Sequence, residues 1–128
     1  MKKSIWIIDD DEIYQMIIRK LIARAKIFEE TFFFNNAVEA LNTIKITEDN
    51  LPSTIFLDIN MPAIDGWQFL ERLEKIYPSL YTKTNVYIVT SSIAYSDKEK
   101  IKEFPGISGF LSKPLNIDIL KEIGESEK

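Results

Sequence analysis

The chain has 128 residues, of which 45% are hydrophobic, so it can form one folded domain with a core of its own. It contains no cysteine and no histidine, which excludes disulfides, thiolate or imidazole metal sites, a Ser-His-Asp triad and phosphorylation of its own histidine. The formal net charge of −4 makes nucleic acid a poor direct partner, because nucleic-acid binding needs a concentrated basic surface.

No run of about 18 uninterrupted apolar residues occurs, so we expect no membrane span and no membrane partner. The opening MKKSIWIIDDDE has an apolar run that is far too short for a signal peptide. It runs into acidic residues rather than a small-residue cleavage site. We therefore expect a cytoplasmic protein.

Short β-branched and apolar segments alternate with segments of helical periodicity. In chain order we predict a strand at 4–9, a helix at 12–25, a strand at 30–35, a helix at 37–46, a strand at 53–58, a helix at 65–77, a strand at 85–92, a helix at 96–104, a strand at 107–112 and a helix at 116–124. In the first helix, Ile13, Ile17 and Leu21 recur at four-residue spacing, with Ile18 and Ile22 beside them.

Five β-then-α units in succession predict an α/β fold, namely a doubly wound, five-stranded parallel sheet with five helices on both faces. The runs before Asp9, Asp58 and Thr90 are nearly continuous in apolar residues, as in strands that are covered on both sides. No repeat or long linker divides the chain, so we expect a single domain spanning 1–128.

Polar or charged residues lie where four of the five predicted strands end. They are Asp9 and Asp10, Asp58, Thr90 and Ser91, and Lys113 followed by Pro114. Because the carboxyl ends of parallel strands meet at one edge of a doubly wound sheet, we expect these side chains to gather where the strand order reverses.

Asp9, Asp10 and Asp58 together carry an excess of negative charge that Lys113 offsets only in part. Crowded carboxylates raise one another's pKa or recruit a cation, and Mg²⁺ suits a site with a few carboxylates, water and a phosphoryl oxygen. Asp58 could then act as a nucleophile toward phosphorus, with the Thr90 hydroxyl and the Lys113 ammonium holding the transferred oxygens.

The sequence resembles the receiver domain of bacterial two-component response regulators over nearly its whole length. The motifs IIDDDE, FLDINMPAIDG, IVTSS and FLSKPL carry this resemblance. It implies the flavodoxin-like strand order 2-1-3-4-5 and a Mg²⁺ site made of Asp9, Asp10, Asp58 and the backbone carbonyl of Asn60. It also implies that Asp58 is the phosphoacceptor.

The resemblance further matches Thr90 to the switch hydroxyl and Lys113 to the phosphoryl-binding lysine, with a cis Lys113–Pro114 peptide bond. Phe110 takes the place of the switch aromatic, which is often tyrosine, so its coupling to Thr90 would be steric. Ser91 stands where many relatives have alanine or glycine.

The function implied is that of a phosphoacceptor in a phosphorelay, not a turnover enzyme. Its partners would be a histidine kinase or a histidine phosphotransfer protein and an unknown downstream protein bound through the face formed by residues 95–124. A phosphorylation-dependent homodimer is a further option. We expect no output domain in this sequence, which would make it either a stand-alone regulator or a fragment of a larger protein.

Other interpretations remain open on the residues alone. A haloacid dehalogenase-type phosphatase or phosphotransferase also uses an aspartate after a strand, but it needs a second aspartate where this chain has Asn60. A phosphate-independent docking module is a third reading, and flavodoxin-like cofactor binding lacks a phosphate loop. Asp11 with Glu12, and Asp65 with Gly66, are sufficiently explained as helix caps and turns.

Overall fold

Five parallel strands form one sheet in the order β2-β1-β3-β4-β5. The computed structural model describes residues 3–46, 51–91 and 94–125. The strands are β1 (Ser4–Ile8), β2 (Glu30–Phe34), β3 (Thr54–Leu57), β4 (Asn85–Thr90) and β5 (Gly109–Ser112). The predicted fold class and strand order are confirmed; residue 92, the predicted end of the fourth strand, lies outside the described residues.

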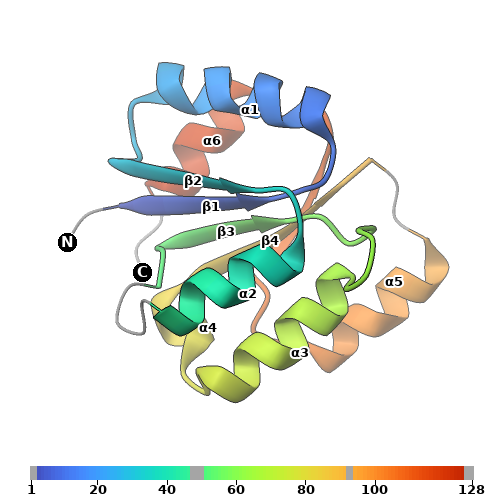
Figure 1. Cartoon of the computed structure of the whole chain (residues 1–128). Coiled ribbons are helices and arrows are strands. Elements are labelled where there is room, and N and C mark those ends of the chain that lie inside the picture. Colours follow the sequence, from blue (N-terminus) through green and yellow to red (C-terminus); the bar gives the residue numbers. More distant parts are fainter. Residues whose placement is uncertain (1–2, 47–50, 92–93, 126–128) are drawn as a thin grey trace.

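Helices cover both faces of the sheet (Figure 1). They are α1 (Glu12–Ala25), α2 (Ala37–Ile46), α3 (Gly66–Ile76), α4 (Leu80–Lys83), α5 (Tyr95–Lys100) with the 3-10 turn η1 (Ile101–Glu103), and α6 (Ile117–Gly124). The five predicted helices are present, whereas α4 was not predicted because a single turn is too short to show periodicity. No helix in the described ranges is both long and apolar enough to cross a membrane.

The hydrophobic core has two halves, one on each side of the sheet. Ile5 and Ile7 of β1 belong to the half between the sheet and helices α1 and α6. Trp6 and Ile8 belong to the half between the sheet and helices α2 and α3. Successive side chains of a strand point to opposite faces, so a buried central strand must be apolar at every position. This is why β1 reads as an unbroken hydrophobic run.

Helix α1 is anchored at its start by Asp11, whose side chain accepts hydrogen bonds from the backbone N–H groups of Ile13 and Tyr14. Its buried face contains Tyr14, Ile18 and Ile22. Ile13 and Ile17 are instead 71% and 49% exposed. The expected cap and helix are therefore present. The row that contains Ile13 and Ile17, from which the helix was predicted, does not face the core.

Helix α3 begins directly beneath the end of β3. Asp65 caps it in a reciprocal arrangement with Gln68, as the cap interpretation predicted. The Gly66 N–H donates to the Ile59 carbonyl at 2.9 Å. A Cβ at Gly66 would lie only 2.6 Å from the Asp58 carbonyl oxygen, so this close approach requires glycine. The end of β3 is thus held at a defined distance from the helix.

Candidate functional site

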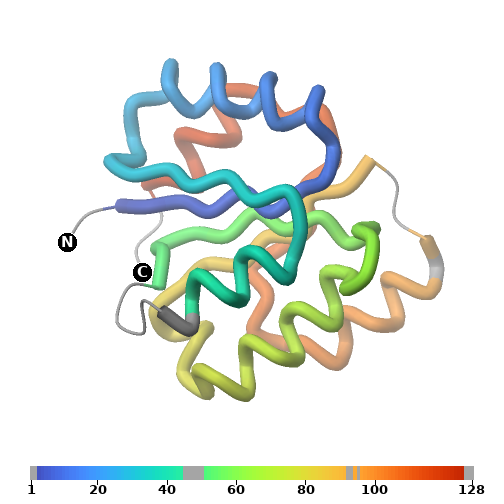
Figure 2. The backbone as a smooth tube through the Cα atoms, in the orientation of Figure 1, coloured from blue at the N-terminus to red at the C-terminus, as the bar shows by residue number. Residues whose placement is uncertain are grey.

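Backbone hydrogen bonds bring residues from separate parts of the chain to one edge of the sheet. The Asp9 N–H donates to the Phe34 carbonyl at 3.0 Å and the Asp58 N–H to the Ile8 carbonyl at 2.9 Å. The Lys113 N–H donates to the Thr90 carbonyl at 2.9 Å. The chain leaves β1, β3 and β4 on the same side of the sheet (Figure 2). Each predicted polar residue therefore sits where its strand ends.

Three carboxylates meet at this edge. Asp9, Asp10 and Asp58 each place one oxygen within 4.8 Å of the other two. Asp9 and Asp58 are buried, whereas Asp10 is exposed. The cluster is consequently open to solvent on the Asp10 side and enclosed by protein around the other two carboxylates.

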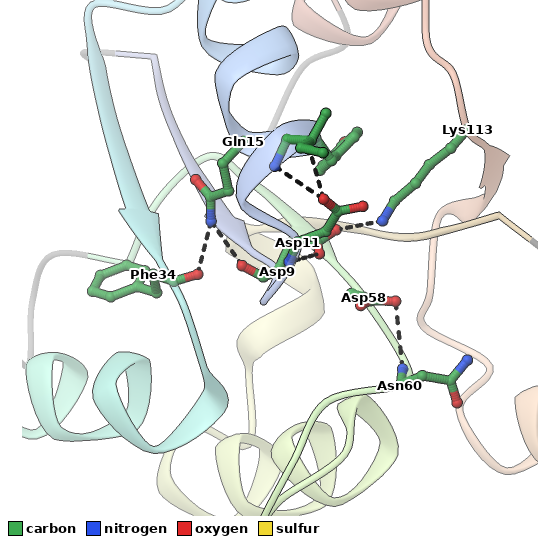
Figure 3. Close-up of polar contacts among 9 residues, drawn as sticks. Asp9, Asp11, Gln15, Phe34, Asp58, Asn60 and Lys113 are labelled. Carbon is green, nitrogen blue, oxygen red and sulfur yellow. Dashed lines mark hydrogen bonds and ion pairs between the residues drawn. The ribbon is translucent and has the colours of Figure 1, made fainter.

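Lys113 compensates one of these charges directly. Its ammonium lies 2.7 Å from Oδ2 of Asp9 (Figure 3). The other Asp9 oxygen accepts a hydrogen bond from the Asp11 N–H at 2.9 Å. Among the described residues, Oδ2 has no hydrogen bond in addition to this ion pair. Asp9 is therefore a paired, buried anion.

Asp58 is less well compensated. Burial raises its pKa to about 7, the negative charge of Asp9 contributes to this rise, and Lys113 lowers the pKa only in part. The Asn60 N–H is a distant donor at 3.4 Å. Burial also raises the pKa of Asp9, against the lowering effect of Lys113. Two buried carboxylates and a third at the rim fit a hard divalent cation such as Mg²⁺.

Two contributors to the site were missed from the sequence. Gln15 is buried and its Nε2 donates to the backbone carbonyls of Asp9 (2.9 Å) and Phe34 (3.0 Å), which ties α1 to the ends of β1 and β2. Tyr14 lies with its ring centroid 4.2 Å from the Lys113 ammonium. Their helical spacing from Ile18 and Ile22 could have indicated that these polar residues face inward.

The remaining predicted residues occupy different environments. Thr90 is buried at the end of β4, and Ser91 is exposed. Phe110 is partly buried in β5 and packs edge-to-face against Trp67, with ring centroids 6.4 Å apart. The Lys113–Pro114 peptide bond is cis. Phe110 therefore packs toward α3, while Thr90 and Lys113 meet at the edge that carries the carboxylates.

The fold and this cluster define a doubly wound α/β domain with an acidic site at the carboxyl edge of its sheet. Residues 5–124 match the family described as the response regulator receiver domain. The chain therefore belongs to the receiver-domain family of two-component response regulators. Receiver domains are signalling domains that bind Mg²⁺ at an acidic cluster, which in this chain corresponds to Asp9, Asp10 and Asp58.

Individual relatives agree with this assignment. The chain is 27% identical over 117 residues to the polar-differentiation response regulator DivK of Brucella anthropi, covering 91% of this chain and 89% of DivK. It is 29% identical over 120 residues to the DNA-binding transcriptional regulator NtrC of Proteus hauseri, of which it spans only 23%. A two-component response regulator structure from Cytophaga hutchinsonii superposes with a TM-score of 0.84 at 27% identity, covering 95% of this chain and 93% of that one.

Proposed function

We propose that this receiver domain accepts a phosphoryl group on Asp58 from the phosphohistidine of a histidine kinase or a histidine phosphotransfer protein. The observation that carries the proposal is the convergence of Asp9, Asp10 and Asp58 within 4.8 Å, with Lys113 paired to Asp9 beside them. Hybrid histidine kinases among the relatives support this class of donor, such as that of Dictyostelium discoideum, 30% identical over 92 residues.

Asp10, Asp58 and the Asn60 carbonyl would hold the Mg²⁺ ion, with Asp9 binding it through water. A bound Mg²⁺ neutralises the carboxylates and shields the phosphoryl oxygens from them. Asp10 is exposed at the rim, which suits a ligand that must be reached from solvent. Asp58 is the buried acid whose charge is least compensated, so it gains most from a cation.

In the transfer step, a carboxylate oxygen of Asp58 attacks phosphorus, the new O–P bond forms and the P–N bond to the donor imidazole breaks. The electron pair of the P–N bond leaves with the imidazole. The Lys113 ammonium and the Thr90 hydroxyl, both at this edge of the sheet, would hold the phosphoryl oxygens. The resulting acyl phosphate carries roughly two negative charges, about one more than the Asp58 carboxylate from which it forms.

This charge would bias the domain toward a second conformation. Lys113 and Thr90 would shift toward the phosphoryl group, and Phe110 would adjust its packing against Trp67. The face formed by residues 95–124 then changes its affinity for a downstream protein or for a second copy of the domain. This is a population shift between two states in a cytoplasmic signalling protein.

The test is labelling by acetyl phosphate, a small-molecule phosphodonor, followed by intact-mass measurement. We expect one Mg²⁺-dependent phosphoryl group on the wild type, none on Asp58→Asn and normal labelling of Asp118→Asn, an exposed acid in α6. Labelling that persists in Asp58→Asn would move the acceptor elsewhere. Steady turnover of p-nitrophenyl phosphate would support the dehalogenase-type alternative, which Asn60 disfavours because an amide cannot serve as the general acid.

A further inference from the structure

Tyr14 is the one aromatic residue of α1, and its side chain is directed at the acidic edge of the sheet. It is 7% exposed and belongs to the half of the core beneath α1 and α6. Its backbone N–H donates to the capping carboxylate of Asp11 at 3.1 Å, so the first turn of the helix holds it in place. The ring is therefore a fixed surface beside the site.

The face of this ring contacts the ammonium of Lys113 at 4.2 Å from its centroid. The same ammonium lies 2.7 Å from Asp9 Oδ2. A cation over an aromatic face is attracted by the ring quadrupole, and more strongly when it is shielded from water. Because the Lys113 side chain is only 14% exposed, this contact lies in the shielded range.

The hydroxyl of Tyr14 does not explain why a tyrosine occupies this position. Among the described residues it has no hydrogen-bond partner, although it is buried. Burial raises the pKa of Tyr14 above its ordinary value, and the charges of Asp9 and Asp58 add to this rise, so the phenol stays neutral. Burying a hydroxyl without a hydrogen-bond partner costs free energy. The favourable contribution of Tyr14 must therefore come from its ring.

We propose that Tyr14 is a positioning residue whose ring face holds the Lys113 ammonium at the edge shared by Asp9 and Asp58. Phosphorylation of Asp58 requires this ammonium to exchange part of its pairing with Asp9 for a phosphoryl oxygen. An uncharged ring face can attract the cation throughout that exchange without competing for it as a further carboxylate would. This inference rests on the proposed function.

The experiment compares Tyr14→Phe, which keeps the ring, with Tyr14→Leu, which removes it. With acetyl phosphate and Mg²⁺, we expect Tyr14→Phe to be phosphorylated within about twofold of the wild-type rate. Tyr14→Leu should be slower by roughly three- to thirtyfold, the range that a partly desolvated cation–π contact supports. Ile18→Val, a packing change one turn further along the same buried face, should keep the wild-type rate.

A double-mutant cycle separates positioning from general destabilisation. In a Lys113→Met background, Tyr14→Leu should cause no further loss of beryllofluoride affinity, because the cation that the ring holds is absent. A similar loss in both backgrounds would overturn the proposal. Equal slowing by Tyr14→Phe and Tyr14→Leu would also overturn it, since the hydroxyl would then be responsible.

A spectroscopic measurement tests the contact independently of phosphorylation. The side-chain methylene protons of Lys113 should show an upfield ring-current shift in wild type and Tyr14→Phe that is lost in Tyr14→Leu. Absence of this shift in the wild type overturns the positioning role. Absence of wild-type labelling with the shift intact would instead overturn the proposed function and leave the Lys113–Tyr14 contact established.

Discussion

Asp9 and Asp58 are buried carboxylates, in positions where a folded domain normally has apolar side chains. Burying a charge is unfavourable unless a partner offsets it. Lys113 is paired with Asp9 at 2.7 Å, and the pKa of Asp58 is raised to about 7. The metal-free site therefore lowers the stability of the domain at neutral pH, and the penalty rests mainly on Asp58.

We predict that Asp58→Asn stabilises the metal-free domain at pH 8 by about 1–3 kcal/mol, because it removes an uncompensated buried charge. The pKa of Asp58 is higher in the folded state than in the unfolded chain, where it is near 3.8. The protonated carboxyl thus favours folding below about pH 4, and this contribution is lost as the pH rises through about 7. The stability advantage of the variant should consequently be smaller at pH 5.

Urea unfolding of both proteins at pH 5 and pH 8, in EDTA and in Mg²⁺, measures these differences. Magnesium should stabilise the wild type more than Asp58→Asn, because the variant loses one anionic ligand. If Asp58→Asn raised the free energy of unfolding more at pH 5 than at pH 8, the destabilisation could not be assigned to the charge of Asp58. Asp118→Asn serves as the exposed control.

At the scale of elements, the junction of β3 and α3 sets the position of Asp58, the proposed phosphoacceptor. Asp58 follows β3, and α3 begins at Gly66, whose α-carbon lies so close that a Cβ would be 2.6 Å from the Asp58 carbonyl oxygen. The obstacle is backbone, which cannot rotate aside as a flexible side chain can. The helix therefore cannot carry a larger residue here without moving Asp58.

Gly66→Ala is expected to destabilise the domain by about 1–3 kcal/mol, the usual cost of overpacking. It should also slow acetyl phosphate labelling, because the Asp58 backbone must shift. Gly109→Ala is the matched control, since its Cβ would meet Tyr87 only at an ordinary 3.7 Å. Urea unfolding and labelling rates check both effects. Equal behaviour of the two variants would show that the close approach at Gly66 is unimportant.

At the scale of the whole molecule, Trp67 connects the start of α3 with α5, with the residue that follows η1, and with β5. Its ring stacks on Phe104 at 5.4 Å and meets Phe110 edge-to-face. Its Nε1 donates to Asp97 Oδ1 at 3.2 Å, and the other Asp97 oxygen accepts from the Ala94 N–H. Trp67 is thus placed to report the conformational change that we propose between the carboxyl edge and the face formed by residues 95–124.

We predict that beryllofluoride with Mg²⁺ changes the tryptophan fluorescence of the domain, because the contacts of Trp67 with Phe110 and Asp97 rearrange. The change should persist in Trp6→Phe, since Trp6 lies in β1 and packs on Phe34 instead. It should vanish in Asp58→Asn. A fluorescence change that follows Trp6 rather than Trp67 would exclude this route of coupling.

The sequence by itself was sufficient for the fold class and for the edge at which the polar residues gather. Both depend on local patterns: apolar strands alternate with helical periodicity, and Asp9, Asp58, Thr90 and Lys113 end their strands. The net negative charge of the chain can likewise be read from its composition. The site roles of these residues remain predictions until phosphorylation and metal binding are measured.

Only the tertiary structure decided how α1 is rotated about its axis. The rows containing Ile13 and Ile17, and Ile18 and Ile22, have the same spacing, and packing against the sheet selects the second row together with Tyr14. The contact of that ring with Lys113 joins residues 99 positions apart, and no local pattern encodes it. The physical reason is that spacing along a helix specifies which residues share a face, whereas the neighbouring elements specify which face is buried.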